Sequence, residues 1–496
     1  MQLNLSNISY TYPGAVEPAL KDVTATFPQG WTGIVGDNGG GKTTLALVAC
    51  GLVRPSSGSV STGLVSRYCA QDATTAPENL EEFAQAYDSL ALRLARDLQI
   101  IDDWYWRYDT LSGGQQKRVQ VACALWSEPD VLVMDEPTNH VDATTREAIA
   151  AALRSFRGVG LLISHDRALL DELCTQCLFV TNGRAVMRPG GYTQASGQAS
   201  LERATTVTAR EKAKREKARL EREAERRREV AARKESKRSL QGIAKHDSDA
   251  RYRKRAAVVS GTDGIAARES SRMNDRAARA AETLNTLRVE RRYDADIWLD
   301  ARPSRRKVLL RMEQTTITMG EDVTLQVPAL YLGNTDHVGL TGDNGSGKTT
   351  LVKRMMAELP DGIRALYIPQ EPSEAQRLTA MNTLRELGSF DRGRVLSIVA
   401  QLNSDPDRVL EGDTISPGEM RKLMLALGML NSPELIVMDE PTNHLDLGST
   451  LALERVLRAY PGALVLVSHD AALVEATTDI TWRIVGTGGS YQLTVV

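Results

Sequence analysis

"GDNGGGKTTL" occupies residues 36–45 and "GDNGSGKTTL" occupies residues 342–351, so nine of ten letters recur 306 positions further along this 496-residue chain. Both copies carry the pattern Gly-x4-Gly-Lys-Thr, and each follows a short, largely apolar run. Glycines in such a loop let backbone N–H groups turn toward a phosphate chain at the positive end of a helix dipole. The sequence therefore predicts a strand, a phosphate-binding loop and a helix, twice in one chain.

Other motifs recur at matching distances. The loop lysine precedes an Asp by 93 and 91 positions, a Ser precedes that Asp by 23 in both halves, and a His follows it by 30 in both. Chance matches of a short motif would not keep three internal distances, so the chain is two copies of one domain of roughly 190 residues. The residues are Lys42, Ser112, Asp135 and His165, and then Lys348, Ser416, Asp439 and His469.

Each copy has the pattern of an α/β fold. Continuous apolar runs end in polar residues, as expected of strands buried in a parallel sheet. Such strands alternate with helical stretches, which indicates an open sheet with its ligand at the carboxyl ends of the strands. The runs are "VLVMDEP" (131–137), "GLLISHD" (160–166), "LIVMDEP" (435–441) and "LVLVSHD" (464–470).

The segment between the copies is basic and rich in helix formers. Residues 201–300 hold 27 Lys and Arg against 18 Asp and Glu, a net +9, whereas the rest holds 34 against 45, a net −11. Residues 209–241 lack Gly and Pro, Gly residues interrupt 242–264, and a second helical stretch covers roughly 265–300. We predict an antiparallel helical hairpin with its tip at 242–264; the alternative is a flexible charged linker. The expected domains are residues 1–200, 201–300 and 301–496.

Composition argues against secretion and membrane insertion. The opening "MQLNLSNISYTYPG" lacks the basic start and apolar run of a signal peptide. No stretch approaches 18 consecutive apolar residues. The "CTQC" pair (174–177) stands without further ligands, so the five cysteines are interpreted as buried thiols in a reducing compartment. We expect a cytoplasmic protein without an integral membrane segment.

The repeated residues form two sets suited to phosphoryl transfer. In each set the lysine would reach the β- and γ-phosphates of ATP, while the next threonine and the strand-end Asp would hold Mg²⁺. The Glu after that Asp would orient or polarise the attacking water, and the His would hydrogen-bond the γ-phosphate. Four of the six histidines (140, 165, 444 and 469) fall at matching positions, which favours function over a structural role.

"LSGGQQKR" (111–118) and "ISPGEMRK" (415–422) form the remaining pair of motifs. Ser and Gly at a helix start make a second phosphate cradle. Each phosphate-binding loop already serves its own nucleotide from one side, so this cradle is useful only if it faces the nucleotide held by the other copy. We therefore expect each ATP to lie between one copy's loop and the other copy's Ser-Gly helix.

With these motifs in order, the sequence resembles the ATP-binding-cassette superfamily across nearly all of both halves. The loops, the glutamines of "YCAQ" (68–71) and "YIPQ" (367–370), the Ser-Gly helices, "MDEPTN" and "SHD" match its motifs. Within that superfamily, the sequence resembles the F subfamily of ribosome-binding ATPases in three features. These are tandem cassettes without membrane spans, the motifs "DEPTNHVD" and "DEPTNHLD", and the long charged inter-cassette segment.

The resemblance implies two tandem P-loop ABC-type ATPase domains joined by a long α-helical hairpin, working as a Mg-dependent ATPase and as a monomer. ATP would close the cassettes, and hydrolysis would reopen them. The hairpin would enter the ribosomal exit site and act on the peptidyl-transfer centre or tRNA, in a translation factor or an antibiotic-resistance protein. Its partners would be 23S rRNA, tRNA and ribosomal proteins. Tyr252 in the tip would either stack on a base or pin the turn.

The resemblance also completes the set of expected site residues. The catalytic residues would be Glu136, Glu440, His165, His469, Gln71 and Gln370. The Mg²⁺ site would use Thr43, Gln71, Asp135, Thr349, Gln370 and Asp439. The first cassette would bind ATP through Tyr12, Gly36, Asn38, Gly39, Gly41, Lys42, Thr43, Thr44, Ser112, Gly113, Gly114 and Gln115. The second would use Gly342, Asn344, Gly345, Gly347, Lys348, Thr349, Thr350, Ser416, Gly418 and Glu419.

Three features depart from the family pattern. Pro417 replaces a glycine and lacks a backbone N–H, so the cradle facing the Lys42 nucleotide loses one donor and the two sites should be unequal. Tyr12 is placed to stack on adenine, whereas the second copy offers only Met319 there. The interval that some relatives fill with a long arm is short and contains "WYWRY" (104–108), which we interpret mainly as subdomain core.

Two other functions fit part of the pattern. A tandem ATPase subunit of a membrane ABC transporter would also carry two cassettes, but a short connector would join them. A DNA-repair or chromosome-associated ATPase typically inserts a zinc module or coiled coil inside a cassette, whereas here the charged helices lie between intact cassettes.

Overall fold

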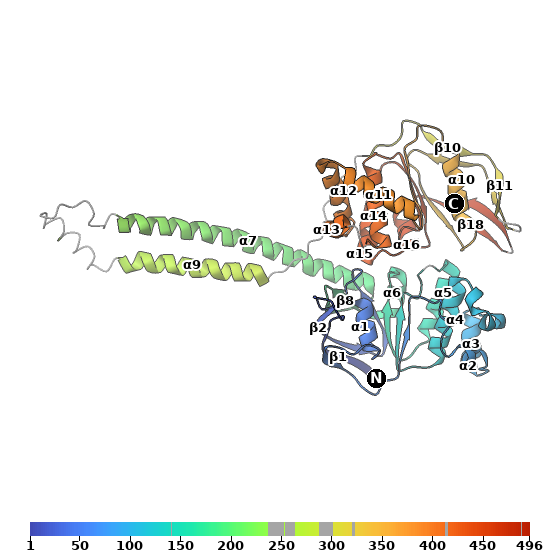
Figure 1. Ribbon diagram of the computed structural model, residues 1–496, viewed down its shortest axis with the longest axis horizontal. Coiled ribbons are helices and arrows are strands. Elements are labelled where there is room, and N and C mark those ends of the chain that lie inside the picture. Colours follow the sequence, from blue (N-terminus) through green and yellow to red (C-terminus); the bar gives the residue numbers. More distant parts are fainter. Residues whose placement is uncertain are drawn as a thin grey trace. The chain divides into compact units, whose positions relative to one another are not determined.

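The structure is a computed structural model that describes residues 1–139, 141–236, 252, 263–286, 301–319, 323–411, 415–487 and 489–496 (Figure 1). Its contacts divide the chain into two compact units. The first unit combines Met1–Ala195 with Arg292–Val496 and so holds both cassettes, and the second is Ser196–Arg291. His140 and most of the predicted hairpin tip lie outside the described residues.

The first cassette is built on a six-stranded sheet in the order β5-β6-β7-β3-β8-β9, parallel except for the last pair. A separate antiparallel sheet, β2-β1-β4, packs beside it. The strands are β1 (Gln2–Tyr10), β2 (Leu20–Pro28), β3 (Gly30–Val35), β4 (Ser57–Val60), β5 (Ser66–Cys69), β6 (Val131–Asp135), β7 (Val159–Ile163), β8 (Cys174–Thr181) and β9 (Arg184–Pro189).

The second cassette repeats the parallel centre, β14-β17-β16-β15, within an eight-stranded sheet ordered β11-β12-β19-β18-β14-β17-β16-β15. Strands β10 and β13 pair separately. The strands are β10 (Val308–Met312), β11 (Thr315–Met319), β12 (Val323–Val327), β13 (Leu330–Gly333), β14 (His337–Gly342), β15 (Ala365–Ile368), β16 (Leu435–Asp439), β17 (Ala463–Val467), β18 (Ile480–Thr487) and β19 (Ser490–Val495).

Helices cover both faces of each parallel sheet because alternate strand residues point to opposite sides. In β6, Val131 and Val133 pack toward α1, whereas Leu132 and Met134 pack toward α4 and α5. The predicted α/β fold with two tandem P-loop domains is therefore confirmed. The first-cassette helices are α1 (Lys42–Ala49), α2 (Leu80–Ala84), α3 (Ser89–Asp97), α4 (Gly113–Trp126), α5 (Ala143–Arg154) and α6 (Arg167–Leu173), with 3-10 turns at Asp102–Trp106 and Tyr108–Thr110.

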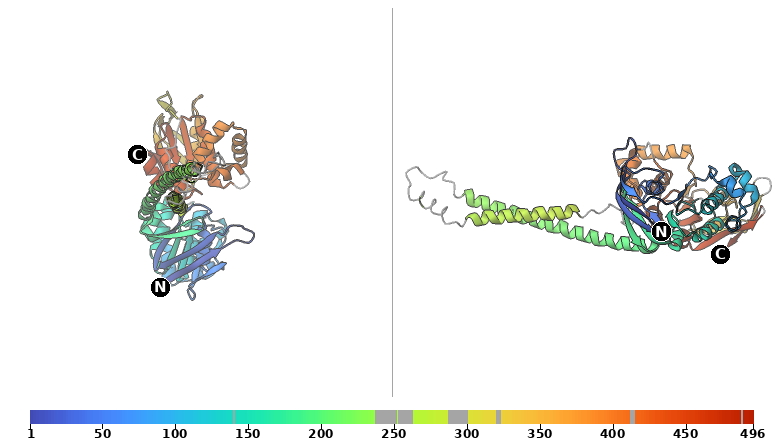
Figure 2. Two further views of the ribbon diagram at one scale, coloured as in Figure 1. Left: turned by 90° about the vertical axis from the view of Figure 1, so that its left-hand side faces the viewer. Right: turned by 90° about the horizontal axis from the view of Figure 1, so that it is seen from below.

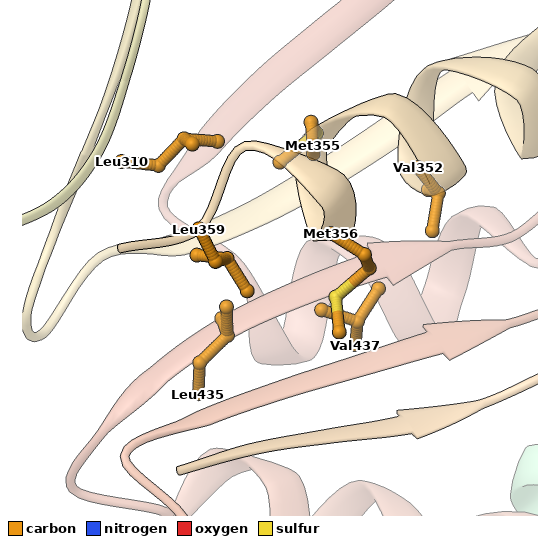
Figure 3. A pocket seen from close by; sticks show the side chains of 7 residues that line it. All are labelled: Leu310, Val352, Met355, Met356, Leu359, Leu435 and Val437. Atoms are coloured by element: carbon orange, nitrogen blue, oxygen red, sulfur yellow. The ribbon is translucent and has the colours of Figure 1, made fainter. Parts of the chain in front are cut away.

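In the second cassette, apolar side chains fill the space between α10 and the sheet (Figure 3). Met356 of α10 lies beside Val437 of β16, and Met355 and Leu435 line the same small apolar space, so the helix that follows the second loop is fixed on the sheet (Figure 3). The helices are α10 (Lys348–Ala357), α11 (Glu374–Glu386), α12 (Ser389–Gln401), α13 (Pro406–Glu411), α14 (Pro417–Met429), α15 (Leu447–Arg458) and α16 (Ala471–Thr477).

The inter-cassette segment contains two antiparallel helices, α7 (Tyr192–Ser236) and α9 (Asp263–Thr286), which lie side by side (Figures 1 and 2). Leu220 and Ala224 of α7 pack with Met273 of α9 in a small buried cluster, which ties the helices together. The first helix extends well before the stretch of helix formers at 209–241: it begins at Tyr192, which is buried in the first cassette, and continues through the polar residues that follow. Residues 287–300 of the predicted second helix lie outside the described residues.

The "WYWRY" stretch is only partly core. Trp104 and Tyr108 are buried among the helices of the first cassette, as expected. Trp106, however, is 68% exposed. The 3-10 turn has three residues per turn, so Trp104 and Trp106 point in different directions and only one of them can face the core.

Candidate functional site

The first phosphate-binding loop runs from the end of β3 into α1. Gly41 takes a left-handed conformation with φ 101° just before the helix, and a Cβ on Gly36 would lie 1.9 Å from the Val180 carbonyl oxygen, so glycine is required at both positions. Lys42 Nζ donates to the carbonyls of Gly36 (2.9 Å) and Asp37 (3.1 Å). The loop therefore curls around its own lysine, ready for an anion.

The second loop repeats this geometry. Lys348 Nζ donates to the Gly342 carbonyl at 2.7 Å and to the Asp343 carbonyl at 2.9 Å. Gly347 has φ 96°, and a Cβ there would lie 2.3 Å from Met319 Sδ, so Met319 packs directly on the loop. In the first cassette, a Cβ on Gly41 would instead meet Ala19 and Leu20, and the Tyr12 hydroxyl lies 2.9 Å from Thr44 Oγ1 at the start of α1.

The parallel sheets bring the threonine of each loop to the Asp at the end of the next strand but one, β6 in the first cassette and β16 in the second. Thr43 Oγ1 donates to Asp135 Oδ2 at 3.1 Å, and Thr349 Oγ1 donates to Asp439 Oδ2 at 2.7 Å. In the first cassette, the Tyr68 hydroxyl adds a 2.8 Å bond to the same Asp135 oxygen. Hydroxyl and carboxylate oxygens meet at both sites, and these are the ligands that Mg²⁺ prefers.

Each adjacent glutamate is buried beside a histidine. The His165 backbone N–H donates to Glu136 Oε2 at 3.2 Å, and the His469 N–H donates to Glu440 Oε2 at 3.4 Å. The ring Nε2 atoms lie 3.2 and 3.6 Å from the other carboxylate oxygen, Oε1. Within the described part of the chain, both Oε1 atoms are buried without a hydrogen-bond partner, so each can accept a bond from a ligand or water.

Burial controls the charge of these groups. It raises the pKa of Glu136 to about 8, with the neighbouring Asp135 adding to the effect, and raises the pKa of Glu440 to about 7. Burial, with help from the loop lysines, lowers the pKa of His165 and His469 to about 4. The histidines are therefore neutral near pH 7 and can donate or accept a hydrogen bond without adding positive charge.

The Ser-Gly helices α4 and α14 begin with reciprocal caps. Ser112 accepts from the Gln115 N–H at 3.4 Å, and the Gln115 side chain accepts from the Ser112 N–H at 2.9 Å. In the second cassette, Glu419 Oε2 accepts from both the N–H (3.0 Å) and the hydroxyl (2.8 Å) of Ser416. These caps use the serine and its partner within each helix, so the predicted contact with the opposing nucleotide stays a prediction.

The cassettes touch through the first loop. Asn38 donates from its backbone N–H to Asp446 Oδ2 at 3.3 Å and from its side chain to the His444 carbonyl at 3.0 Å. Asn403 donates to Asp37 Oδ1 at 3.3 Å. These contacts place the loop around Lys42 against Asn403, His444 and Asp446 of the other cassette, as an ATP site shared between the halves requires.

A cavity of about 750 Å³ lies at the second loop and is lined by both cassettes. It contains most of the expected residues of the second site together with Glu136 and His165 of the first cassette. Ser112 to Gln115 do not line it. The other first-cassette residues that line it are Thr138, Asn139, Val141, Ala143, Arg146, Glu147, Asp166, Arg167 and Ala168. The expected residues that line the cavity are Asn344, Gly345, Gly347, Lys348, Thr349, Thr350, Gln370, Asp439, Glu440 and His469.

Sequence reasoning missed several residues around these sites. Asn403 carries no motif signal, because its place depends on how α12 packs beside α14. Asp446 ends the "DEPTNHLD" motif as Asp142 ends "DEPTNHVD", and Arg421 stands in "ISPGEMRK" where Lys117 stands in "LSGGQQKR". The matching positions in the two copies were a usable signal. Gln71 is exposed, and its carbonyl accepts a bond from buried Lys117 at 2.9 Å.

Comparisons with known proteins agree with this geometry. The ABC transporter family model matches residues 20–139 and 325–443. The ribosome protection protein VmlR of Bacillus subtilis is 27% identical over 99% of this chain and 88% of its own length. The energy-dependent translational throttle protein EttA of Mycobacterium tuberculosis is 26% identical over 92% and 87%, and the tylosin resistance ATP-binding protein TlrC of Streptomyces fradiae is 28% identical over 95% and 94%.

The chain belongs to the F subfamily of ATP-binding-cassette proteins. This ABC-F protein is a P-loop ATPase whose two domains bind ATP. Its fold also matches the solved structure of RNase-L Inhibitor, with a TM-score of 0.62 and 17% identity over 98% of this chain and 90% of that one. In the part of the chain that the structure describes, we find no helix with the length and hydropathy to cross a bilayer.

Proposed function

We propose that this ABC-F protein is a Mg-dependent ATPase that binds the ribosome in its ATP-closed state and acts there through the helical hairpin, as a translation factor or a ribosome-protecting resistance protein. The main support is the pairing of two complete loop-lysine, Thr–Asp and Glu–His sets with the α7/α9 hairpin between them. Hydrolysis of ATP to ADP and phosphate would release the protein.

The residues of each set divide the work of hydrolysis. Lys42 and Lys348 neutralise the β- and γ-phosphates, and the neighbouring Thr–Asp pairs would hold Mg²⁺, which supplies charge neutralisation at the phosphates. Within the described residues, no three His, Cys, Asp or Glu side chains form a metal cluster, so the ion would take its other ligands from phosphate, water and glutamine oxygens. The unpartnered Oε1 of Glu136 or Glu440 is the acceptor that orients the attacking water.

Ribosome binding is supported by charge and by relatives. Residues 201–300 carry a net +9 on a chain that is otherwise acidic, and RNA phosphates favour such a segment. The relatives named for ribosome protection and for a translational throttle match more than nine-tenths of this chain. We infer a cytoplasmic monomer whose partners are 23S rRNA, tRNA and ribosomal proteins near the exit site, with the hairpin directed at the peptidyl-transfer centre.

Co-sedimentation with ribosomes tests this proposal. The Glu136→Gln/Glu440→Gln protein should bind ATP without clearing it, and we expect it to pellet with ribosomes in ATP and to dissociate as salt is raised. The Lys42→Ala/Lys348→Ala protein, which cannot hold the phosphates, is the control and should stay in the supernatant. A trapped protein that ignores ribosomes but binds membranes would instead support the transporter-subunit alternative.

A further inference from the structure

Arg421 joins two loops of the second cassette, the one at Gln370 and the one at Glu440–Asn443, with one side chain. It lies on α14, five residues after Ser416, and is only 3% exposed. One guanidinium nitrogen donates to the Gln370 carbonyl, and the other donates to the carbonyls of Glu440 (3.3 Å) and Asn443. The helix that carries the Ser-Gly cradle is thereby tied to the glutamate at the end of β16.

The matching position in the first cassette works differently. Lys117 Nζ donates to the carbonyls of Ala70 (2.8 Å) and Gln71 (2.9 Å) and to Gln120 Oε1 (2.8 Å). An ammonium has three donors, and all three are used there. A planar guanidinium has five donors in a wide fork, so Arg421 reaches the glutamine loop and the glutamate at once.

The bond to the Glu440 carbonyl acts on a constrained part of the backbone. Glu440 has φ 47°, in the left-handed region that most residues avoid. Its N–H donates to the Val467 carbonyl at 2.8 Å, and its C=O accepts from Arg421 and from the Asn443 N–H, each at 3.3 Å. Because both peptide groups of Glu440 are held, a shift of Arg421 changes the direction in which the carboxylate points.

The start of α14 also contacts the loop that touches the other cassette. A Cβ on Gly418 would lie 2.6 Å from the His444 carbonyl oxygen, so helix and loop pack with no space between them. That same oxygen accepts from Asn38, which belongs to the loop around Lys42. A continuous path of contacts therefore runs from the Lys42 loop, through residues 443–446, to Arg421 and Glu440.

We propose that Arg421 is a positioning residue through which nucleotide at the Lys42 site sets the rate of hydrolysis by Glu440 at the Lys348 site. The proposal rests on the function proposed above, which makes Glu440 the residue that orients water. Lys117 offers no matching link to Glu136, so the effect on hydrolysis runs in one direction; rates, unlike affinities, need not be coupled symmetrically.

The test compares two backgrounds that report only on the Lys348 site. Glu136→Gln keeps ATP at the Lys42 site without hydrolysis, and Lys42→Ala removes the phosphate-binding charge there. We expect single-turnover hydrolysis to be at least about tenfold faster in the first background. Adding Arg421→Lys should slow the first background and bring the ratio of the two rates close to one, with ATP binding unchanged by equilibrium dialysis. An unchanged ratio overturns the proposal.

Two controls separate this role from general damage. Arg354 lies on α10 with its side chain 59% exposed. Arg354→Lys makes the same chemical change and should leave the ratio intact; an equal loss there overturns the proposal. Arg421→Gln should act like Arg421→Lys, which covers the case in which one variant folds poorly. If the Glu136→Gln protein binds ATP but hydrolyses none, the role of Glu440 in the proposed function fails; hydrolysis with an unchanged ratio refutes only the role of Arg421.

Discussion

An ion pair between the cassettes makes a quantitative prediction. Arg167 at the start of α6 and Glu454 on α15 approach to 2.8 Å, with side chains 17% and 20% exposed. The approach lacks the direction of a good hydrogen bond, so its contribution is Coulombic. The equivalent positions of the internal repeat are Ala471 and Ala150, so the pair exists on one side only.

The size of the effect follows from distance and burial. Two unit charges at 2.8 Å attract by about 6 kcal/mol at an effective dielectric constant of 20. Desolvation of two largely buried ions offsets most of this, so Arg167→Ala, which leaves Glu454 unpaired, should cost about 1–2 kcal/mol. For a domain of about 200 residues this lowers the Tm by roughly 4 °C.

Calorimetry of the nucleotide-free protein in a double-mutant cycle measures this pair. We expect Arg167→Ala and Glu454→Ala each to lower the Tm, and the double variant to lower it by little more than either single change. The double variant reproduces the alanine pair that the repeat already uses, and it is therefore the matched control. If the two single shifts simply add, the residues are not coupled and the reasoning is wrong.

Two further predictions concern the nucleotide sites. The pKa of Glu136 is raised to about 8 in the folded protein, so the folded state loses stability as the pH rises from about 4.5 to 8 and this buried carboxyl ionises. Glu136→Gln cannot ionise, so its Tm should rise relative to that of the parent over this pH range. A Tm difference that stays constant with pH would contradict the assignment. Tyr12→Ala should weaken ATP binding at the Lys42 site about tenfold through lost base stacking, while Tyr12→Phe, which loses only the Thr44 contact, should bind nearly as the parent does in a fluorescent-nucleotide titration.

Much of the fold followed from local patterns. The run Val131–Asp135 is fully buried and lies between two other strands of its sheet, as its unbroken apolar residues predicted. Parallel strands then bring their carboxyl ends together, so the approach of Thr43 to Asp135 could be expected from spacing and topology. Such features are local or depend only on the order of elements.

Other features depend on packing that no local pattern records. Helix propensity marked residues 209–241, whereas the helix begins at Tyr192, which is buried in the first cassette. The contact between Asn403 and Asp37 joins residues 366 positions apart and needs the second cassette to be folded and docked. The link from Arg421 to Glu440 depends on how far the guanidinium reaches from α14 to the end of β16. The motif shows only that this position is an arginine.

The one-sided ion pair has a practical consequence for mutagenesis. In an assembly of two identical subunits, every interface substitution appears twice, so its two effects cannot be told apart. Here Arg167 and Glu454 meet once, and their repeat partners are alanines. A single codon change therefore alters one half of the interface and leaves the other as an internal reference. A saturation mutagenesis scan of α6, α15 and α16 should accordingly show unequal tolerance at positions that correspond in the two cassettes. Such a scan would map which cassette tolerates substitution at each corresponding position.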